Sequence, residues 1–263
     1  MLKTVDVITA EDLRSGRRLL GAWCHTTSPV CAEILAKSGY EVIVPDMEHG
    51  PYSLPTLTGV LQAIESRGCF AMVRAPWNDM VRIKQILDCG AHGIHVPYVQ
   101  TAEEAAYAVR SCKYPMDGWR GVASNQRATD YGMDKANYFA RANCDVIVMI
   151  AIETPEGVRN ARAIAATEGV DGIFIGPNDL ATSMGHMADP SQPDVREAIR
   201  TVEEAALAEG KFLASIAAPG ADAQAKFDRG YSLLYVFSDT SGLAQAALAA
   251  RRNSVPAPLP DRD

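Results

Sequence analysis

The chain has 263 residues, and its formal net charge of −7 disfavours a nucleic-acid partner, because binding phosphates requires a basic face. Its 48% hydrophobic content is sufficient for a closed core, and no apolar run reaches the ~18 residues of a membrane span. The N-terminal segment is mixed polar, unlike a signal peptide, and the six cysteines form no CxxC pair. These features predict a cytoplasmic metabolic enzyme with reduced thiols.

Eight short apolar or β-branched runs alternate with longer segments of helical pattern. The expected strands are 19–24, 41–46, 70–74, 93–99, 145–152, 172–175, 212–217 and 232–237. The expected helices between them are 28–39, 54–68, 78–90, 101–112, 155–169, 194–210 and 221–230. This alternation predicts an α/β fold, a single (β/α)8 TIM barrel over residues 1–252, followed by a Pro-rich tail at 253–263. An open doubly wound sheet is the alternative, but the sequence lacks the GxGxxG and GxxxxGK turns that often accompany it.

Residues 113–143 interrupt the alternation between the fourth and fifth expected strands with Gly, Pro, aromatic and charged residues. Irregular segments of this length in a compact domain are usually functional or lie at an interface. We therefore expect this segment, which includes Arg120, to take part in function or in subunit contacts.

Polar residues follow the expected strands at the end where a barrel carries its active site. They are Trp23 and His25 after the first strand, Asp46, Glu48 and His49 after the second, and Arg74, Glu153 and Asp179 after the third, fifth and sixth. Ionisable groups in such apolar surroundings are costly without partners. One interpretation is that these residues form buried salt bridges that brace the barrel mouth. The convergence of so many ionisable residues on one rim favours an active site instead, where His25 could touch a substrate.

Glu153 and Asp179 form an oxygen-ligand pair without clustered His or Cys, which favours Mg²⁺, Mn²⁺ or Co²⁺ over structural zinc. Two protein ligands leave coordination positions for water and for a chelating 2-oxo acid, whose enolate the metal would stabilise. Arg74 could donate to the same acid. His49 is the best acid or base on the rim, and the segment 176–183 resembles a turn into a helix N-terminus suited to a carboxylate.

Several motifs in a fixed order now resemble one family: DMEHGP, VRAPWND, GWRGV, IETPEGV and GVDGIFIGPNDLATSMG. Over nearly its whole length the chain is similar to the HpcH/HpaI aldolases, which are metal-dependent, class II pyruvate aldolases. The resemblance implies a barrel of the phosphoenolpyruvate/pyruvate type. It also implies a homo-oligomer, commonly a hexamer, in which neighbouring subunits complete the site.

The resemblance also implies roles for individual residues. Glu153 and Asp179 correspond to the two metal ligands, and Arg74 to the arginine that binds the keto oxygen and stabilises the enolate. His49 corresponds to the catalytic histidine, and Asp88 to the aspartate that pairs with it. The residues implied to lie near the substrate are Trp23, Ala151, and the amides of Asn178 and Asp179, with Asp46 close to the subunit boundary.

The sequence departs from the family in three places. Ala151 stands where the family usually has Gln, two residues before the expected metal-binding glutamate. His25 and Thr26 also differ from the residues that relatives carry after the first tryptophan, and the last strands carry unusual residues at Ser215, Phe237 and Ser238. These departures indicate an intact metal site beside a reshaped acceptor pocket.

The expected reaction is reversible aldol cleavage of a 4-hydroxy-2-oxo acid to an aldehyde and pyruvate, or a close 2-oxo acid such as hydroxypyruvate. His49, assisted by Asp88, would take the proton of the C4 hydroxyl, and Arg74 would hold the enolate. A Schiff-base route is disfavoured because no lysine ends an apolar strand. The alternatives are another metal-enolate lyase or decarboxylase on the same barrel, or a non-catalytic 2-oxo-acid binder in which Ala151 marks lost activity.

Overall fold

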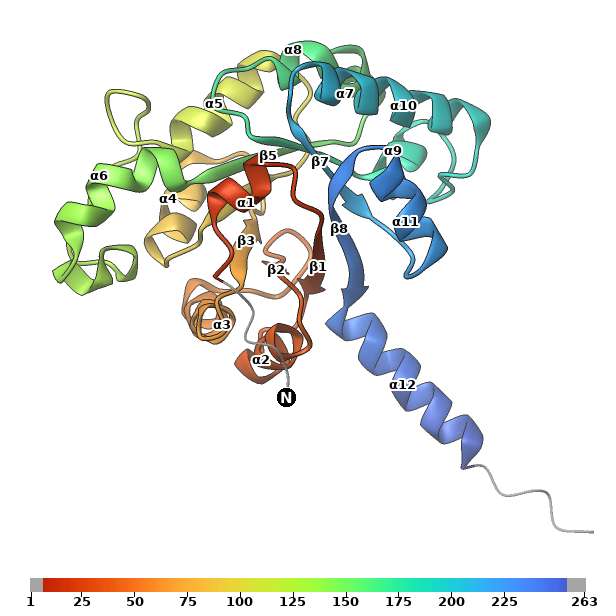
Figure 1. The fold of residues 1–263 in the computed structure, drawn as a ribbon, viewed down its shortest axis with the longest axis horizontal. Helices are drawn as coiled ribbons and strands as arrows, with labels where there is room; N and C mark the ends of the chain where they lie inside the picture. The colour runs from red at the N-terminus through yellow and green to blue at the C-terminus, as the bar shows by residue number, and fades with distance from the viewer. Residues whose placement is uncertain (1–6, 255–263) are drawn as a thin grey trace, which may run out of the picture.

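The computed structural model describes residues 7–254, and its centre is a closed barrel of eight parallel strands in sequential order (Figure 1). The strands are β1 (Leu19–Cys24), β2 (Val42–Pro45), β3 (Phe70–Arg74), β4 (Gly93–Val96), β5 (Ile147–Ile152), β6 (Gly172–Ile175), β7 (Phe212–Ile216) and β8 (Tyr231–Ser238). The pairing of β8 with β1, which aligns Leu233 with Leu19, closes the sheet. The (β/α)8 barrel expected from the sequence is therefore confirmed.

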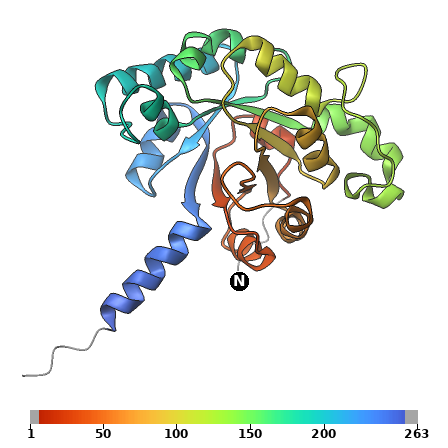
Figure 2. The same ribbon diagram turned by 180° about the vertical axis from the view of Figure 1, so that it is seen from behind.

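Helices lie around the outside of the barrel (Figures 1 and 2). They are α2 (Pro29–Lys37), α3 (Leu54–Glu65), α4 (Met80–Asp88), α5 (Ala102–Cys112), α7 (Pro155–Arg159), α8 (Ala161–Ala165), α9 (Pro177–Ser183), α10 (Pro193–Ala208) and α11 (Ala221–Asp228). Short polar side chains begin several of them: Ser28, Ser53, Asp79, Thr101 and Thr154 each accept a hydrogen bond from the backbone amide three residues later. Such caps satisfy amides that have no partner inside the helix.

Four elements were not expected. They are α1 (Ala10–Arg14), the 3-10 helix η1 (Arg127–Gly132), α6 (Lys135–Asp145) and α12 (Asp239–Asn253). The segment 113–143 is thus partly helical, and β5 begins at Ile147 because Asp145 still belongs to α6. The expected tail begins at Asn253, which is the last residue of α12, and its remainder from 255 lies outside the described residues.

Two apolar layers explain why the strands are almost continuously hydrophobic. On β5, Val148, Ile150 and Ile152 pack in the layer between the sheet and the helices. Met149 and Ala151, which alternate with them, belong to a second cluster with Trp23, Phe174 and Tyr235. Because both faces of a parallel barrel are covered, β2 to β6 are buried to their last residue, and a polar residue there is informative.

Helix α12 projects away from the barrel (Figures 1 and 2). Asp239, its first residue, is the one buried residue of the helix, whereas Leu243 is 66% and Leu248 52% exposed. None of the helices in residues 7–254 is long and apolar enough to cross a membrane.

Candidate active site

The carboxyl ends of β2 and β3 are joined by a buried ion pair. Arg74 Nε and Nη2 donate to Asp46 Oδ1 and Oδ2, both at 2.8 Å, and Asp46 is fully buried. Burial alone would raise the pKa of Asp46, but hydrogen bonds and charges from His25 and Arg74 outweigh it and hold that pKa well below its usual range. Asp46 is therefore an anion whose two oxygens fix the plane of the guanidinium.

Two further contacts hold Arg74. Its Nη1 lies 3.1 Å from Glu48 Oε2, and its guanidinium carbon lies 4.5 Å from the centre of the Trp23 ring. Burial raises the pKa of Glu48, with the carboxylates of Asp46 and Asp179 acting in the same direction and Arg74 against it. The orientation of Arg74 is thus fixed by the carboxylates of Asp46 and Glu48 and by the Trp23 ring.

Glu153 follows β5 and is 3% exposed, and its Oε2 accepts a hydrogen bond of 3.0 Å from the backbone amide of Tyr98. Burial raises its pKa to about 7, and the nearby carboxylates of Asp179 and Glu48 add to this. Tyr98 has φ of 57°, a left-handed conformation that is strained for a bulky residue and typical of functional sites. The backbone amide of Tyr98 thus holds the Glu153 carboxylate in place, although burial of its charged form is unfavourable.

Asp179 lies in the first turn of α9, after β6, close enough to Glu153 for their charges to interact. Between them, Gly176 has no side chain, and a Cβ there would come within 2.5 Å of Glu153 Oε1. Glycine at this position keeps the space beside the Glu153 carboxylate open.

A divalent cation suits this arrangement of oxygen donors. Glu153 and Asp179 repel one another, and a bound cation would relieve that repulsion. Within residues 7–254, no group of three or more His, Cys, Asp or Glu side chains is placed to hold a metal by itself. The pair therefore fits a hard cation that takes its remaining oxygens from water and substrate, as Mg²⁺ and Mn²⁺ do.

The pairing expected between His49 and Asp88 is not made within the chain. The His49 side chain is 63% exposed, and its Nε2 lies 3.7 Å from Glu48 Oε2. Asp88 ends α4, which returns the chain to the amino end of the barrel, and Asp88 Oδ1 accepts a hydrogen bond of 2.7 Å from Arg120 Nη2. His49 and Asp88 thus lie at opposite ends of the barrel.

The other residues expected near the substrate lie at the rim or just beneath it. Trp23 is 7% exposed under Arg74, and Ala151 is fully buried in the same inner cluster. Asn178 is exposed in the first turn of α9, a helix that begins without a side-chain cap. Ala151 is therefore part of the inner apolar cluster, two residues before Glu153.

Sequence reasoning missed Tyr98 and Asp239. Tyr98 acts through its backbone amide, so no side-chain pattern could have revealed it. Asp239 directly follows β8, a position at which the strand-end rule would have found it; its oxygens accept hydrogen bonds from the amides of His25 and Thr26 at 2.9 and 3.0 Å.

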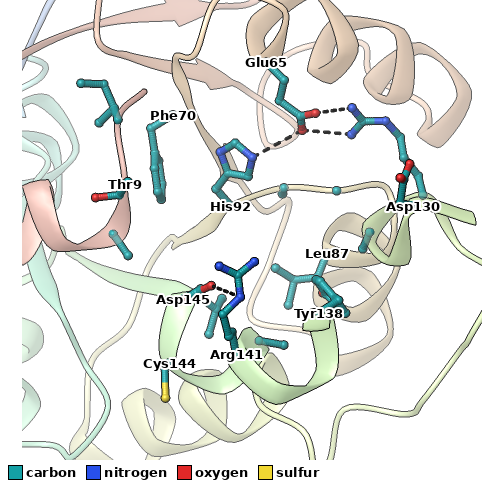
Figure 3. A pocket seen from close by; sticks show the side chains of 18 of the residues that line it. Thr9, Glu65, Phe70, Leu87, His92, Asp130, Tyr138, Arg141, Cys144 and Asp145 are labelled. Atoms are coloured by element: carbon teal, nitrogen blue, oxygen red, sulfur yellow. Dashed lines mark hydrogen bonds and ion pairs between the residues drawn. The ribbon is translucent and has the colours of Figure 1, made fainter. Parts of the chain in front are cut away.

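A cavity of about 950 Å³ lies at the other end of the barrel, where Phe70, His92 and Tyr138 line part of it (Figure 3). Arg120 also lines this cavity. We call it the amino-end cavity because it lies where strands begin. Its Glu65 carboxylate accepts a hydrogen bond of 3.0 Å from Arg127 Nη1 and lies 3.5 Å from His92 Nε2. The carboxylate pair of Glu153 and Asp179 lies at the opposite end, at the carboxyl-end rim.

The fold and the rim together define a (β/α)8 enzyme with an arginine and two acids, Glu153 and Asp179, at the carboxyl ends of its strands. The chain belongs to the HpcH/HpaI aldolase/citrate lyase family, whose sequence pattern matches residues 19–246. The family resemblance is thereby confirmed, and the chain is an aldolase, a carbon–carbon lyase.

Three relatives illustrate the similarity. A hydroxypyruvate/pyruvate aldolase of Delftia acidovorans is 44% identical over 238 residues, 90% of this chain and 88% of that protein. A 5-keto-4-deoxy-D-glucarate aldolase of Escherichia coli is 40% identical over 220 residues, 84% of this chain and 86% of that protein. The crystal structure of a family protein from Burkholderia cenocepacia superposes with a TM-score of 0.88 at 36% identity, covering 92% of this chain and 97% of that one.

Proposed function

We propose that the protein catalyses reversible, divalent-metal-dependent cleavage of a 4-hydroxy-2-oxo acid into an aldehyde and pyruvate or hydroxypyruvate. The observation that carries this proposal is the buried Glu153 carboxylate, with its raised pKa, close to an Arg74 held by Asp46. The names of the two curated relatives, a hydroxypyruvate/pyruvate aldolase and a 5-keto-4-deoxy-D-glucarate aldolase, support a 2-oxo acid as the donor.

Glu153 and Asp179 would hold the metal, Mg²⁺ or Mn²⁺ or alternatively Co²⁺. When bound, a divalent cation acts as a Lewis acid that polarises the keto oxygen of the donor. The protein's own part is to hold the Glu153 carboxylate in place through the Tyr98 amide and to leave space beside it at Gly176.

Arg74 would donate to the oxygen that becomes negative as the C3–C4 bond breaks. A preorganised donor contributes most when its orientation is fixed before the reaction, and a single one contributes about 3–4 kcal/mol. Asp46, Glu48 and Trp23 provide that orientation. The amides of Asn178 and Asp179, at the uncapped start of α9, would bind the carboxylate of the donor, with Trp23 and Ala151 beneath it.

His49 would accept the proton of the C4 hydroxyl, because an imidazole at the rim can serve as a general base. Within residues 7–254, no side chain lies at hydrogen-bond distance from the exposed His49 ring, so Asp88 of the partner subunit would orient it. We infer a homo-oligomer, hexameric as the family resemblance implies, and the exposed leucines of α12 support association.

A screen of 4-hydroxy-2-oxo acids with Mn²⁺ or Mg²⁺ tests the proposal, with lactate dehydrogenase reporting pyruvate and a separate assay for aldehyde. We expect equal amounts of both products and loss of turnover with EDTA. Activity that is insensitive to EDTA would overturn the metal-dependent scheme. Pyruvate without aldehyde would indicate a decarboxylase, and metal-dependent oxalate binding without turnover would indicate a 2-oxo-acid binder.

A further inference from the structure

His25, one of the departures from the family, lies beside the buried ion pair. Its ring is stacked on Trp23, with centres 5.9 Å apart and planes at 27°. Its Nδ1 lies 3.0 Å from Ser238 Oγ and 3.8 Å from Asp239 Oδ1, and its Nε2 lies 3.3 Å from Asp46 Oδ2. Both ring nitrogens therefore face oxygens of the protein, which leaves neither for a substrate.

The Asp46 carboxylate is surrounded by donors of the protein. Its Oδ1 accepts hydrogen bonds from Arg74 Nε at 2.8 Å and from the backbone amides of Glu48 and His49 at 3.1 and 3.4 Å. Its Oδ2 faces Arg74 Nη2 at 2.8 Å and His25 Nε2 at 3.3 Å. Because Asp46 is fully buried, no water replaces a partner that is lost, and its carboxylate would turn toward whichever donors remain.

We propose that His25 is a positioning residue that fixes Asp46, and through Asp46 fixes the guanidinium of Arg74 for the donor 2-oxo acid. The inference rests on the proposed function, since it takes Arg74 to be the arginine that binds the donor. It assigns His25 no contact with the reacting atoms. His25 is anchored in turn by Asp239, which accepts hydrogen bonds from its amide and from Thr26.

The charges around the His25 ring agree with its position between Asp46 and Asp239. The charged groups around the ring are Asp46 at the end of β2 and Asp239 at the start of α12, with Arg74 beyond Asp46. Hydrogen bonds to Asp239 and Asp46 raise the pKa of His25 to about 9, against the opposing effect of burial. An imidazolium at neutral pH donates from both nitrogens, which matches the two acceptors that it faces.

Two substitutions separate the parts of this role. His25→Phe keeps an aromatic ring on Trp23 but removes both donors, whereas His25→Gln keeps one donor group and removes the charge. Because small misplacements of a binding group are costly, we expect ~30-fold weaker oxalate binding for His25→Phe and ~5-fold for His25→Gln. In turnover, KM for the donor should rise by similar factors. His186→Gln is the matched control, because His186 also pairs with an aspartate, Asp194 at 2.9 Å, outside this cluster.

The decisive measurement is a double-mutant cycle with Asp46→Asn. Oxalate binding in the presence of Mn²⁺ is measured by calorimetry, with thermal unfolding as a check that each variant is folded. If His25 acts through Asp46, His25→Phe should change affinity less than ~3-fold in the Asp46→Asn background. Normal binding by both His25 variants, or a full effect of His25→Phe in that background, would overturn the inference.

The two proposals fail in different ways. If the wild-type protein binds oxalate but cleaves no 4-hydroxy-2-oxo acid, the proposed reaction fails while the cycle still tests His25. If cleavage is normal and both His25 variants match wild type in binding and KM, the positioning role fails while the aldolase reaction stands.

Discussion

The two ends of the barrel differ in how their acids are balanced. At the amino-end cavity, Glu65 faces Arg127, and Asp88 is paired with Arg120. At the carboxyl-end rim, Glu153 and Glu48 lie close to Asp179, and burial together with the charge of Asp179 raises the pKa of both glutamates. The end that contains the cavity is thus the one whose acids are paired with arginines. Unbalanced charge, rather than volume, marks the functional end of this molecule.

The difference has a physical cause. A buried carboxylate without a compensating cation costs the fold several kcal/mol, so it persists only where another function requires it. At the amino end, Glu65, which Arg127 faces, contributes to stability instead. Substitutions that remove a carboxylate charge should therefore have opposite effects on stability at the two ends.

Removing the rim carboxylate should have the largest effect. Glu153→Gln is expected to lower kcat by about 10³-fold, because metal polarisation and enolate stabilisation are worth several kcal/mol. In EDTA, the same change should raise the free energy of unfolding by about 1 kcal/mol, since it removes a buried charge repelled by Asp179 and Glu48. Mn²⁺-supplemented cleavage assays and urea unfolding measure the two effects. Near-normal cleavage would remove Glu153 from the site.

The position of Asp88 at the amino end predicts that the two ends meet between subunits. His49→Ala and Asp88→Asn should each lower kcat by about 100-fold, as loss of general acid–base catalysis does. Mixing the two variants under conditions that allow subunit exchange should restore part of the activity, because some interfaces then combine intact His49 with intact Asp88. Mixtures no more active than their components would place the pair elsewhere.

Much of the rim could be predicted from the sequence because a closed parallel sheet leaves little freedom. Once eight alternating runs define the barrel, all carboxyl ends of the strands meet at one rim, which brings Arg74, Glu153 and Asp179 together. The bounds of β1, β3 and β6 agreed with the expected runs because strands covered on both faces are apolar throughout.

The features that the sequence could not predict depend on closure of the barrel or on another subunit. His25 meets Asp239 only because β8 pairs with β1, more than two hundred residues later in the chain. Asp88 sits on an amphipathic helix, where a partner cannot be read from spacing. Helix α12 was missed because its leucines face no surface of the barrel, so no core-facing apolar stripe identified it.

At the amino end, Glu65→Gln should reduce stability without changing the chemistry. The substitution removes the charge that Arg127 and His92 face, and we expect the free energy of unfolding to fall by about 1 kcal/mol. Glu65, unlike Asp88, has no proposed role in the reaction, so kcat should stay within ~2-fold of wild type. Urea unfolding and steady-state kinetics on the same preparation test the separation. A large loss of kcat would show that Glu65 takes part in the reaction.

The smallest expected effect is a pH dependence of stability that belongs to the rim alone. The pKa of His25 is raised to about 9 in the folded protein, mainly by its hydrogen bonds to Asp239 and Asp46. A raised pKa in a base means that folding favours the protonated form. Its stabilisation is therefore complete below the unfolded pKa of ~6.5 and is lost as the pH rises through about 9. Since the ring is partly exposed, we expect this contribution to be about 1 kcal/mol.

Urea unfolding between pH 6 and pH 10 should show wild type losing that amount relative to His25→Gln, while His186→Gln follows wild type. Parallel curves for wild type and His25→Gln would mean that His25 is neutral in the folded protein, and Asp46 would then depend on Arg74 alone for its charge balance.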